Sequence, residues 1–248
     1  MIENTILCVR WGDKYDQTYV EKLKKQCEDN CSVPFNFYCL TDNPQTEYDL
    51  LLPRHWDKYY IPSKNTFWAY RKCYMFNEEL FPQMEGVHFL YLDLDVLIHH
   101  DLKYFFDLSW DKPYIVRGWW NDIDNCRKNY GKMKSTPLNS SVIRWQKKQL
   151  KCVYKQIQEN LDVIFFSYST IDNYFNHFWY NVWDEKGSFF DTYPKGDIYS
   201  WYKGNIFPND MDPYKIRADL KICLFNNSAS KIYSDEKMYD IKELDDKW

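Results

Sequence analysis

The stretch Val87-His88-Phe89-Leu90-Tyr91-Leu92-Asp93-Leu94-Asp95-Val96 decides the fold of this chain. Its apolar run, 89–92, is typical of a strand that is buried on both faces, as in a parallel sheet. Side chains alternate along a strand, so we expect Asp93 and Asp95 to point the same way. Two such carboxylates repel each other, and a hard divalent cation would hold them together and also bind a diphosphate. The alternative is that the two acids only begin a loop, since Asp favours turns.

The length of 248 residues predicts one domain over 1–233, of the α/β class that its order of strands and helices indicates, followed by a helical tail at 234–248 that docks onto it. Aromatic residues make up 20% of the chain, which suits both a core and a surface that stacks on sugars or bases. The formal net charge of -4 disfavours a nucleic-acid partner. Neither GxGxxG nor GxxxxGK[ST] occurs, so a glycine-rich phosphate cradle is not expected.

Cysteine usage and the N-terminal sequence predict a reducing, cytoplasmic location. None of the eight cysteines has CxxC or paired zinc spacing, and Cys8 and Cys223 lie within apolar runs, as buried reduced thiols do. We find no signal peptide and no apolar run long enough to span a membrane. The Asn- and Lys-rich, Gly-poor composition suggests an AT-rich genome, which leaves open a viral protein in an infected host cell.

Several strand ends are expected to converge. Strands at 6–9 and 35–40 enclose a helix that begins near Thr18, with Thr18 and Glu21 as a capping box. This order predicts a right-handed βαβ unit with parallel strands. Because ligands bind beyond the carboxyl ends of such strands, the segments that follow them should form one composite site together with the two acids.

The rest of the chain alternates between predicted strands and helices. We expect strands at 50–53, 114–117, 139–143 and 221–225, helices at 63–79, 102–108, 144–160 and 165–178, a polar loop up to Pro137, and short strands and loops over 183–208.

Three groups of residues stand out within these elements. Lys72 lies among aromatic residues and either reaches solvent or supplies a cation near phosphates. Trp119 and Trp120 precede a polar loop and are either core residues or an aromatic wall for an acceptor sugar. Asp172 and Asn173 lie in an apolar helix and are either a buried hydrogen-bonded pair or part of a site.

The segments 9–15, 38–42, 91–95 and 139–142 together resemble GT-A glycosyltransferases, which are nucleotide-sugar-dependent enzymes with a DxD metal motif. The sequence is most similar to a bacterial and viral group with an RWGxxY start, broadly of the glycogenin and lipopolysaccharide galactosyltransferase type. The resemblance covers about residues 6–231. It implies a Rossmann-like, mostly parallel mixed sheet flanked by helices, and Mn²⁺ or Mg²⁺ as the cofactor.

The resemblance also implies roles for individual residues. The nucleoside would be held by Val9, Arg10, Trp11, Gly12, Tyr15, Thr41 and Asp42. The metal would be bound by Asp93 and Asp95. The donor sugar and its phosphates would be contacted by Lys72, Asp93, Asn139, Ser140 and Lys203. The catalytic pair would be Asp172 and Asn173.

One segment departs from the family pattern. The family usually ends its last strand with Phe-His-Gly, whose His is often a third metal ligand, but this chain has Phe225-Asn226-Asn227. The amide oxygen of Asn226 can ligate a hard cation only weakly. We therefore expect Asn226 to be a weak third ligand.

The expected function is a metal-dependent glycosyltransferase that moves a sugar from a nucleotide sugar, expected to be a UDP-sugar, to a hydroxyl of a glycan or other acceptor, with retention. Asp93 and Asp95 also allow a phosphohydrolase of the haloacid-dehalogenase type, in which Asp93 would be the nucleophile. The departure at Asn226 allows a third hypothesis, a carbohydrate-binding or nucleotide-sugar-binding protein without catalysis.

Overall fold

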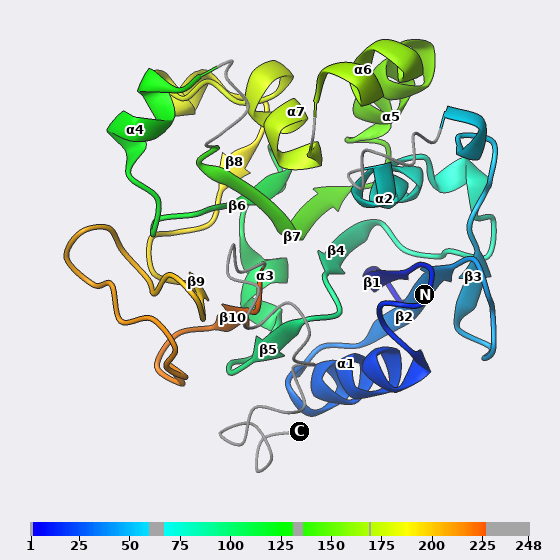
Figure 1. The fold of residues 1–248 in the computed structure, drawn as a ribbon. Coiled ribbons are helices and arrows are strands. Elements are labelled where there is room, and N and C mark those ends of the chain that lie inside the picture. Colours follow the sequence, from blue (N-terminus) through cyan, green and yellow to red (C-terminus); the bar gives the residue numbers. More distant parts are fainter. Residues whose placement is uncertain (1, 60–66, 131–135, 169, 227–248) are drawn as a thin grey trace.

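The computed structural model describes residues 2–59, 67–130, 136–168 and 170–226. Its main sheet has seven strands in the order β3-β2-β1-β4-β7-β6-β8 (Figure 1). Their bounds are Asn4–Arg10 (β1), Phe35–Thr41 (β2), Asp49–Leu51 (β3), His88–Leu92 (β4), Tyr114–Arg117 (β6), Leu138–Gln146 (β7) and Asp191–Thr192 (β8). Every neighbouring pair is parallel except the two that involve β7. The predicted mixed, mostly parallel sheet is therefore confirmed.

The first βαβ unit forms as predicted. Strands β1 and β2 pair in parallel on either side of α1, Gln17–Asp29. The helix cap differs from the prediction, because Asp16 has extended backbone and its carboxylate accepts the Thr18 N–H at 3.0 Å. Asp16 therefore replaces the expected Thr18–Glu21 capping box.

Helices cover both faces of the sheet (Figure 1). Ile6 and Cys8 of β1 pack into the core that α1 covers, whereas Leu7 faces the opposite core. That opposite core includes residues of α5 (Lys151–Glu159), α6 (Leu161–Ser167) and α7 (Ile171–Phe178). The central strands are buried on both sides, which explains their nearly continuous apolar sequence.

A second, three-stranded sheet has the order β5-β10-β9, with β5 at Val96–Ile98, β9 at Ile198–Ser200 and β10 at Ile222–Leu224. Strand β4 ends at Leu92, which confirms the strand predicted at 89–92, but Asp93 and Asp95 follow it outside the strand, where the expected alternation of side chains does not continue. Residues 93–95 form a bend that connects the two sheets, and the buried Leu94 anchors it in the core.

Three predicted helices are wrong in their extent. The segment expected at 63–79 contains the short α2 (Phe67–Tyr70) and the 3₁₀ turns η2 (Arg71–Phe76) and η3 (Glu78–Leu80), and 60–66 lie outside the described residues. The helix expected at 144–160 starts only at Lys151, because β7 continues through the fully buried Trp145 to Gln146. The helix expected at 165–178 is two helices, α6 and α7.

The remaining elements are short. The polar loop predicted up to Pro137 contains a helix, α4 (Ile123–Lys128), which Asp122 caps through two backbone N–H groups. The other helical segments are α3 (Lys103–Asp107), η1 (Asp57–Tyr59) and η4 (Glu185–Gly187). The predicted tail helix at 234–248 lies outside the described residues. No helix in the described part of the chain is both long and apolar enough to cross a membrane.

Candidate active site

The predicted site residues gather along the edge of the main sheet that is formed by the carboxyl ends of its parallel strands. Strands β1, β2, β4 and β6 all end at this edge, and the antiparallel β7 begins there. The register pairs Arg117, the last residue of β6, with Leu138, the first residue of β7. Asn139 and Ser140 therefore lie at the same edge as the acids that follow β4. This arrangement is the crevice position at which open α/β sheets bind ligands.

Asp93 is held by a cation and a hydroxyl. Lys72 Nζ lies 2.7 Å from Asp93 Oδ1, and the Tyr91 hydroxyl donates to the same oxygen. The Asp93 N–H donates to the carbonyl of Ser141 at 2.8 Å, which extends the β4–β7 ladder by one residue. Tyr91 is not among the predicted site residues, although it lies two residues before Asp93 and the alternation of β4, which the Asp93 N–H extends by one residue, places both on one face.

Asp95 has different hydrogen-bond partners from Asp93. The Tyr15 hydroxyl donates to Asp95 Oδ2 at 2.7 Å. The carbonyl of Asp95 accepts the Phe225 N–H at 3.0 Å, which brings the end of β10 beside the acids. The first and last strands of the predicted site thus meet at this one residue.

Asp172 joins the site through an irregularity in β7. The pairing register between β6 and β7 shifts at Ile115/Val116, so residues 140–142 have no direct partner in β6. Such a bulge releases backbone groups from the ladder. The freed Ser140 N–H donates to Asp172 Oδ1 at 2.9 Å, in the first turn of α7. Lys72 Nζ also lies 3.4 Å from the carbonyl of Ser140, so Lys72 and Ser140 link Asp93 to Asp172.

The three carboxyl groups have different pKa values. Burial alone would raise the pKa of Asp93, but the Lys72 charge and the hydrogen bonds that Asp93 accepts lower it below the ordinary range. Burial and the Asp93 charge raise the pKa of Asp95. Burial also raises the pKa of Asp172, against the opposing effect of the Ser140 hydrogen bond. Unequal carboxyl pKa values at one strand edge are typical of functional sites.

The segment predicted to hold the nucleoside lies at the ends of β1 and β2. The Gly12 N–H donates to Asp42 Oδ2 at 3.3 Å, and Arg10 Nη2 donates to the Asn43 carbonyl at 2.5 Å. Val9 is partly buried, and the fully buried Thr41 accepts the Asn43 N–H through its hydroxyl at 3.2 Å. The structure therefore brings these two predicted segments together.

A buried arginine supports the Trp11 side of this segment. The Arg71 guanidinium lies 3.4 Å from the centre of the Trp11 ring, and its Nη2 lies 2.9 Å from Asp57 Oδ1. Arg71 is 3% exposed, so it does not reach solvent. The neighbouring residues Arg71 and Lys72 thus contact different parts of the predicted site: Arg71 packs on Trp11, and Lys72 pairs with Asp93.

Lys203 and Asn226, predicted from the late strands, belong to one hydrogen-bonded group. Lys203 Nζ donates to Asn121 Oδ1 at 3.2 Å, and its N–H donates to the Ser200 hydroxyl at 3.2 Å. The Ser200 hydroxyl in turn donates to Asn226 Oδ1 at 2.7 Å. Lys203 is therefore connected to Asn226, at the end of β10, through Ser200.

The residues present fit a hard divalent cation. Asp93 and Asp95 each use one oxygen in the contacts described above, which leaves the second oxygen of each carboxylate outside those contacts. Within the described residues, no three His, Cys, Asp or Glu side chains form a metal-binding group. The amide oxygen of Asn226, the residue predicted as a weak third ligand, retains acceptor capacity beside its bond to Ser200. An all-oxygen set of this kind suits Mg²⁺ or Mn²⁺.

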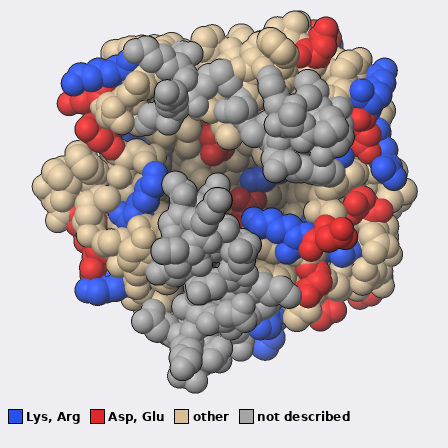
Figure 2. Space-filling model, viewed as in Figure 1, with Lys and Arg blue, Asp and Glu red and all other residues tan. Residues whose placement is uncertain are grey.

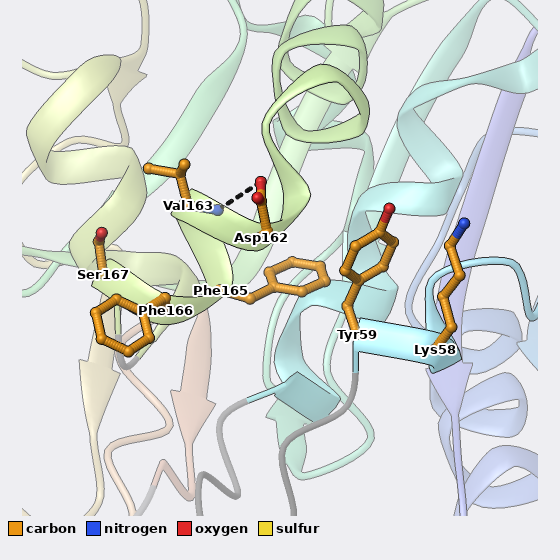
Figure 3. Close-up of a pocket in the computed structure, with 7 residues that line it drawn as sticks. All are labelled: Lys58, Tyr59, Asp162, Val163, Phe165, Phe166 and Ser167. Carbon is orange, nitrogen blue, oxygen red and sulfur yellow. Dashed lines mark hydrogen bonds between the residues drawn. The ribbon is translucent and has the colours of Figure 1, made fainter.

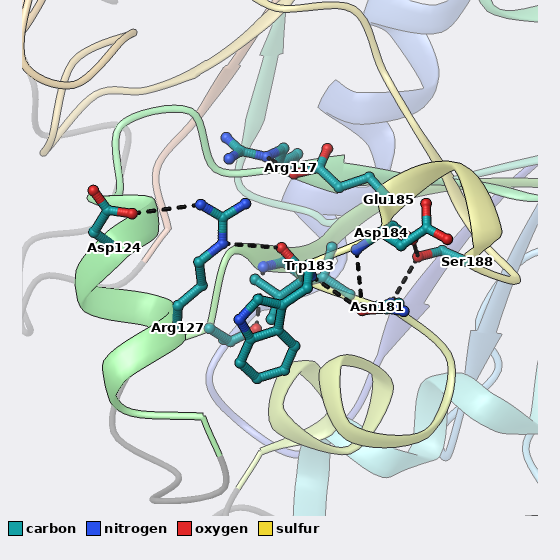
Figure 4. Close-up of polar contacts among 11 residues, drawn as sticks. Arg117, Asp124, Arg127, Asn181, Trp183, Asp184, Glu185 and Ser188 are labelled. Carbon is teal, nitrogen blue, oxygen red and sulfur yellow. Dashed lines mark hydrogen bonds and ion pairs between the residues drawn. The ribbon is translucent and has the colours of Figure 1, made fainter.

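The two tryptophans differ in exposure. Trp120 is 3% exposed and packs into the core that α1 covers, so its ring has no open face for an acceptor. Trp119 is partly exposed, with the Arg117 guanidinium 3.7 Å from its ring centre. Arg117 Nε lies 3.3 Å from Glu185 Oε1 in a polar cluster between β6, α4 and η4 (Figure 4). Of the two predicted acceptor residues, Trp119 therefore remains a candidate and Trp120 does not.

Asn139 and Asn173 complete the set of predicted residues. Asn139 Oδ1 accepts the Ser141 N–H at 3.0 Å, which stabilises the start of β7 beside the bulge. Asn173 is 8% exposed, and its N–H donates to the Thr170 hydroxyl that caps α7. Asn173 therefore shares the helical turn that presents Asp172.

A cavity of about 560 Å³ lies between η1 and α6 (Figure 3). It is lined by Lys58, Tyr59, Asp162, Val163, Phe165, Phe166 and Ser167. Its lining is mostly apolar and includes none of the predicted site residues. The face shown in Figure 2 carries acidic and basic side chains side by side.

Comparisons with known proteins agree with this architecture. No protein-family model matches the sequence, and no curated protein matches it. Among solved structures, the chain is similar to a glycosyltransferase involved in glycosylation of the major capsid of PBCV-1, with a TM-score of 0.55 and 18% identity over 96% of this chain and 100% of that one. It is similar to the galactosyltransferase LgtC in complex with donor and acceptor sugar analogues, with a TM-score of 0.59 and 12% identity over 93% and 90%.

Mouse xyloside xylosyltransferase 1 is a third similar structure, with a TM-score of 0.52 and 11% identity over 91% of this chain and 98% of that one. All three matches span nearly the whole of both chains, so the similarity concerns the complete architecture. At these identities the matches define the fold. The chain has the fold of GT-A glycosyltransferases, as its sequence motifs predicted.

Proposed function

We propose that this protein is a metal-dependent glycosyltransferase that transfers a sugar from a nucleotide sugar to a hydroxyl group of a glycan or glycoconjugate. The observation that supports this proposal best is the chain of contacts from Asp93 through Lys72 and Ser140 to Asp172. In this proposal the contacts would link a diphosphate site at Asp93 to a sugar site at Asp172, in a fold that glycosyltransferases share. The LgtC complex with donor and acceptor analogues adds support by analogy.

The proposed donor site has three parts. The nucleoside would lie against the segment from Val9 to Tyr15 and against Asp42. The divalent cation would be held by Asp93 and Asp95, with Asn226 as a weaker third ligand. When bound, such a cation acts as a Lewis acid that neutralises the charge of the leaving diphosphate.

The cations of the chain itself assist the leaving group. Lys72 lies 2.7 Å from Asp93, so its ammonium group is already positioned beside the expected diphosphate. Lys203 is exposed, and in this proposal it contacts a phosphate oxygen. Preorganised positive charge of this kind stabilises the charge that develops as the glycosidic bond breaks.

Asp172 is the candidate that stabilises the sugar in the transition state. Glycosyl transfer passes through an oxocarbenium-like state, which a nearby carboxylate stabilises. The Ser140 N–H and the first turn of α7 fix the Asp172 carboxylate in place. We propose retention of configuration, with the departing phosphate taking the proton of the acceptor hydroxyl. The anomeric configuration of the product, measured by NMR, tests this part.

A thermal-shift screen with UDP-, GDP-, CMP- and dTDP-sugars in the presence of Mn²⁺ is the first test, because a donor that binds only the folded state raises the melting temperature. We expect a UDP-sugar to give the largest shift and to transfer its sugar to a glycan acceptor. Binding without turnover against any acceptor would favour a non-catalytic protein. No binding, together with hydrolysis of p-nitrophenyl phosphate, would favour a phosphohydrolase.

A further inference from the structure

Tyr15 connects two parts of the proposed donor site that are far apart in sequence. It lies in the loop after β1, where the nucleoside is expected, and its hydroxyl donates to Asp95 Oδ2 at 2.7 Å across a separation of 80 residues. The resemblance to known families suggested only a nucleoside contact for this residue. Its hydrogen bond to Asp95 adds a second role.

The Tyr15 ring has a defined position. Its centre lies 4.8 Å from that of Tyr19, in an edge-to-face arrangement, and Lys14 Nζ lies 4.5 Å from the ring centre. Tyr19 is 2% exposed and belongs to α1, so the ring is anchored against a rigid element. The hydroxyl of Tyr15 is therefore held in place rather than free to follow movements of the Asp95 carboxylate.

The Asp95 carboxylate needs such a partner. Asp93 forms an ion pair with Lys72 and also accepts the Tyr91 hydroxyl, whereas Asp95 forms no ion pair within the described residues. A carboxylate that rotates freely presents its oxygens to a cation for only part of the time. A hydroxyl that fixes one oxygen directs the other oxygen in a constant direction, as residues behind metal ligands generally do.

We propose that Tyr15 is a positioning residue that orients the Asp95 carboxylate for a divalent cation and thereby connects the nucleoside segment to the metal site. This inference rests on the proposed function, because it assumes that Asp95 is a metal ligand. Tyr15 acts through Asp95 and is not itself a ligand. The residue class needed is a rigid ring with a hydroxyl, which only Tyr provides.

The test compares Tyr15→Phe, which keeps the ring, with Tyr104→Phe as a matched control. Tyr104 makes the same kind of bond, to Asp197 Oδ2 at 2.6 Å, but Asp197 precedes β9, away from the edge where β9 ends. We expect Tyr15→Phe to weaken Mn²⁺ binding about 10-fold, measured by electron paramagnetic resonance without donor. The control should bind Mn²⁺ as the wild type does.

A double-mutant cycle separates positioning from folding. In an Asp95→Asn background, Tyr15→Phe should cause no further loss of Mn²⁺ affinity, and the melting temperature of the single variant should fall no more than that of the control. Unchanged Mn²⁺ affinity in Tyr15→Phe would overturn this inference and leave the proposed function intact. A wild-type protein that does not bind Mn²⁺ would overturn both the inference and the metal site of the proposed function.

Discussion

Lys72 Nζ lies 2.7 Å from Asp93 Oδ1, in a site where a cation is expected to bind the same carboxylate. Both groups are mostly buried, with side-chain exposures of 15% and 20%, so solvent screens this pair less than a surface pair. The ion pair neutralises Asp93 and leaves Asp95 as the less compensated acid. Donor binding would then give Lys72 a second anionic partner, the diphosphate.

Replacing Lys72 should affect catalysis more than folding. Lys72→Met removes the positive charge, and we expect kcat/KM for transfer to fall about 100-fold because the leaving group loses preorganised charge. Lys72→Arg should retain part of the activity. Lys25→Met, which breaks only an exposed pair with Asp29, is the control and should leave kcat/KM unchanged. Equal activity of Lys72→Met and wild type would exclude the role proposed for this residue.

Asp95→Asn should abolish transfer while leaving the protein folded. The amide keeps an oxygen that can accept the Tyr15 hydroxyl, and loss of the charge relieves the repulsion from Asp93 that raises the pKa of Asp95. We therefore expect an unchanged or slightly higher melting temperature together with transfer below detection. A chelator should stop the wild-type enzyme, and added Mn²⁺ should restore it. Full activity of the variant with metal present would contradict the metal site.

Much of the fold follows from local sequence pattern. The strands at β1, β2 and β4 are short apolar runs that end in polar or turn residues, so their position and their common edge could be predicted. The start of β7 was predicted, but its length was not. Arg144 and Trp145 occur where a helical pattern also fits. Their place in a strand follows from pairing with β4, and for Arg144 also with β6, and both are fully buried.

The contacts within the site depend on tertiary structure. The hydrogen bond of Tyr15 to Asp95 spans 80 residues, and that of Ser140 to Asp172 spans 32. No local periodicity reports such pairs, and the bulge that frees the Ser140 N–H exists only once β6 and β7 have paired. Tyr91 is the exception, because its spacing of two residues from Asp93 on a strand already places both on one face.

The pH dependence of activity should reflect Asp172. Burial raises the pKa of Asp172, so the folded protein holds this proton to a higher pH than the unfolded chain does. If the carboxylate form is required, kcat/KM should fall on the acid side through a pKa above the ordinary value for Asp. Asp172→Asn should lower kcat about 100-fold and remove this acid limb from the residual activity. An unchanged acid limb in the variant would assign it to another group.

The raised pKa of Asp172 also affects stability. Activity is expected to rise as Asp172 ionises, whereas the stability of the fold is expected to fall. A raised pKa in the folded state contributes stability at low pH, and this contribution is lost as the pH rises through the folded-state value. Asp172→Asn cannot ionise, and it can still accept the Ser140 N–H. We therefore expect the variant to be more stable than the wild type at pH 7 in urea unfolding, with the difference shrinking towards pH 4. A variant that is less stable at pH 7 would show that the ionised carboxylate stabilises the fold.

The two adjacent tryptophans should separate stability from acceptor binding. Trp120 is 3% exposed in the core, so Trp120→Ala should lower the free energy of unfolding by about 3–5 kcal/mol. Trp119 is partly exposed beside Arg117, so Trp119→Ala should cost much less stability and raise the KM for the acceptor. Trp119→Phe keeps a ring and should retain most of the acceptor affinity. If Trp119→Ala lost activity only because the ring no longer packs on Arg117, a saturating acceptor concentration would not restore the rate. If Trp119→Ala leaves the acceptor KM unchanged while kcat and donor KM also stay constant, the acceptor must bind elsewhere along this edge of the sheet.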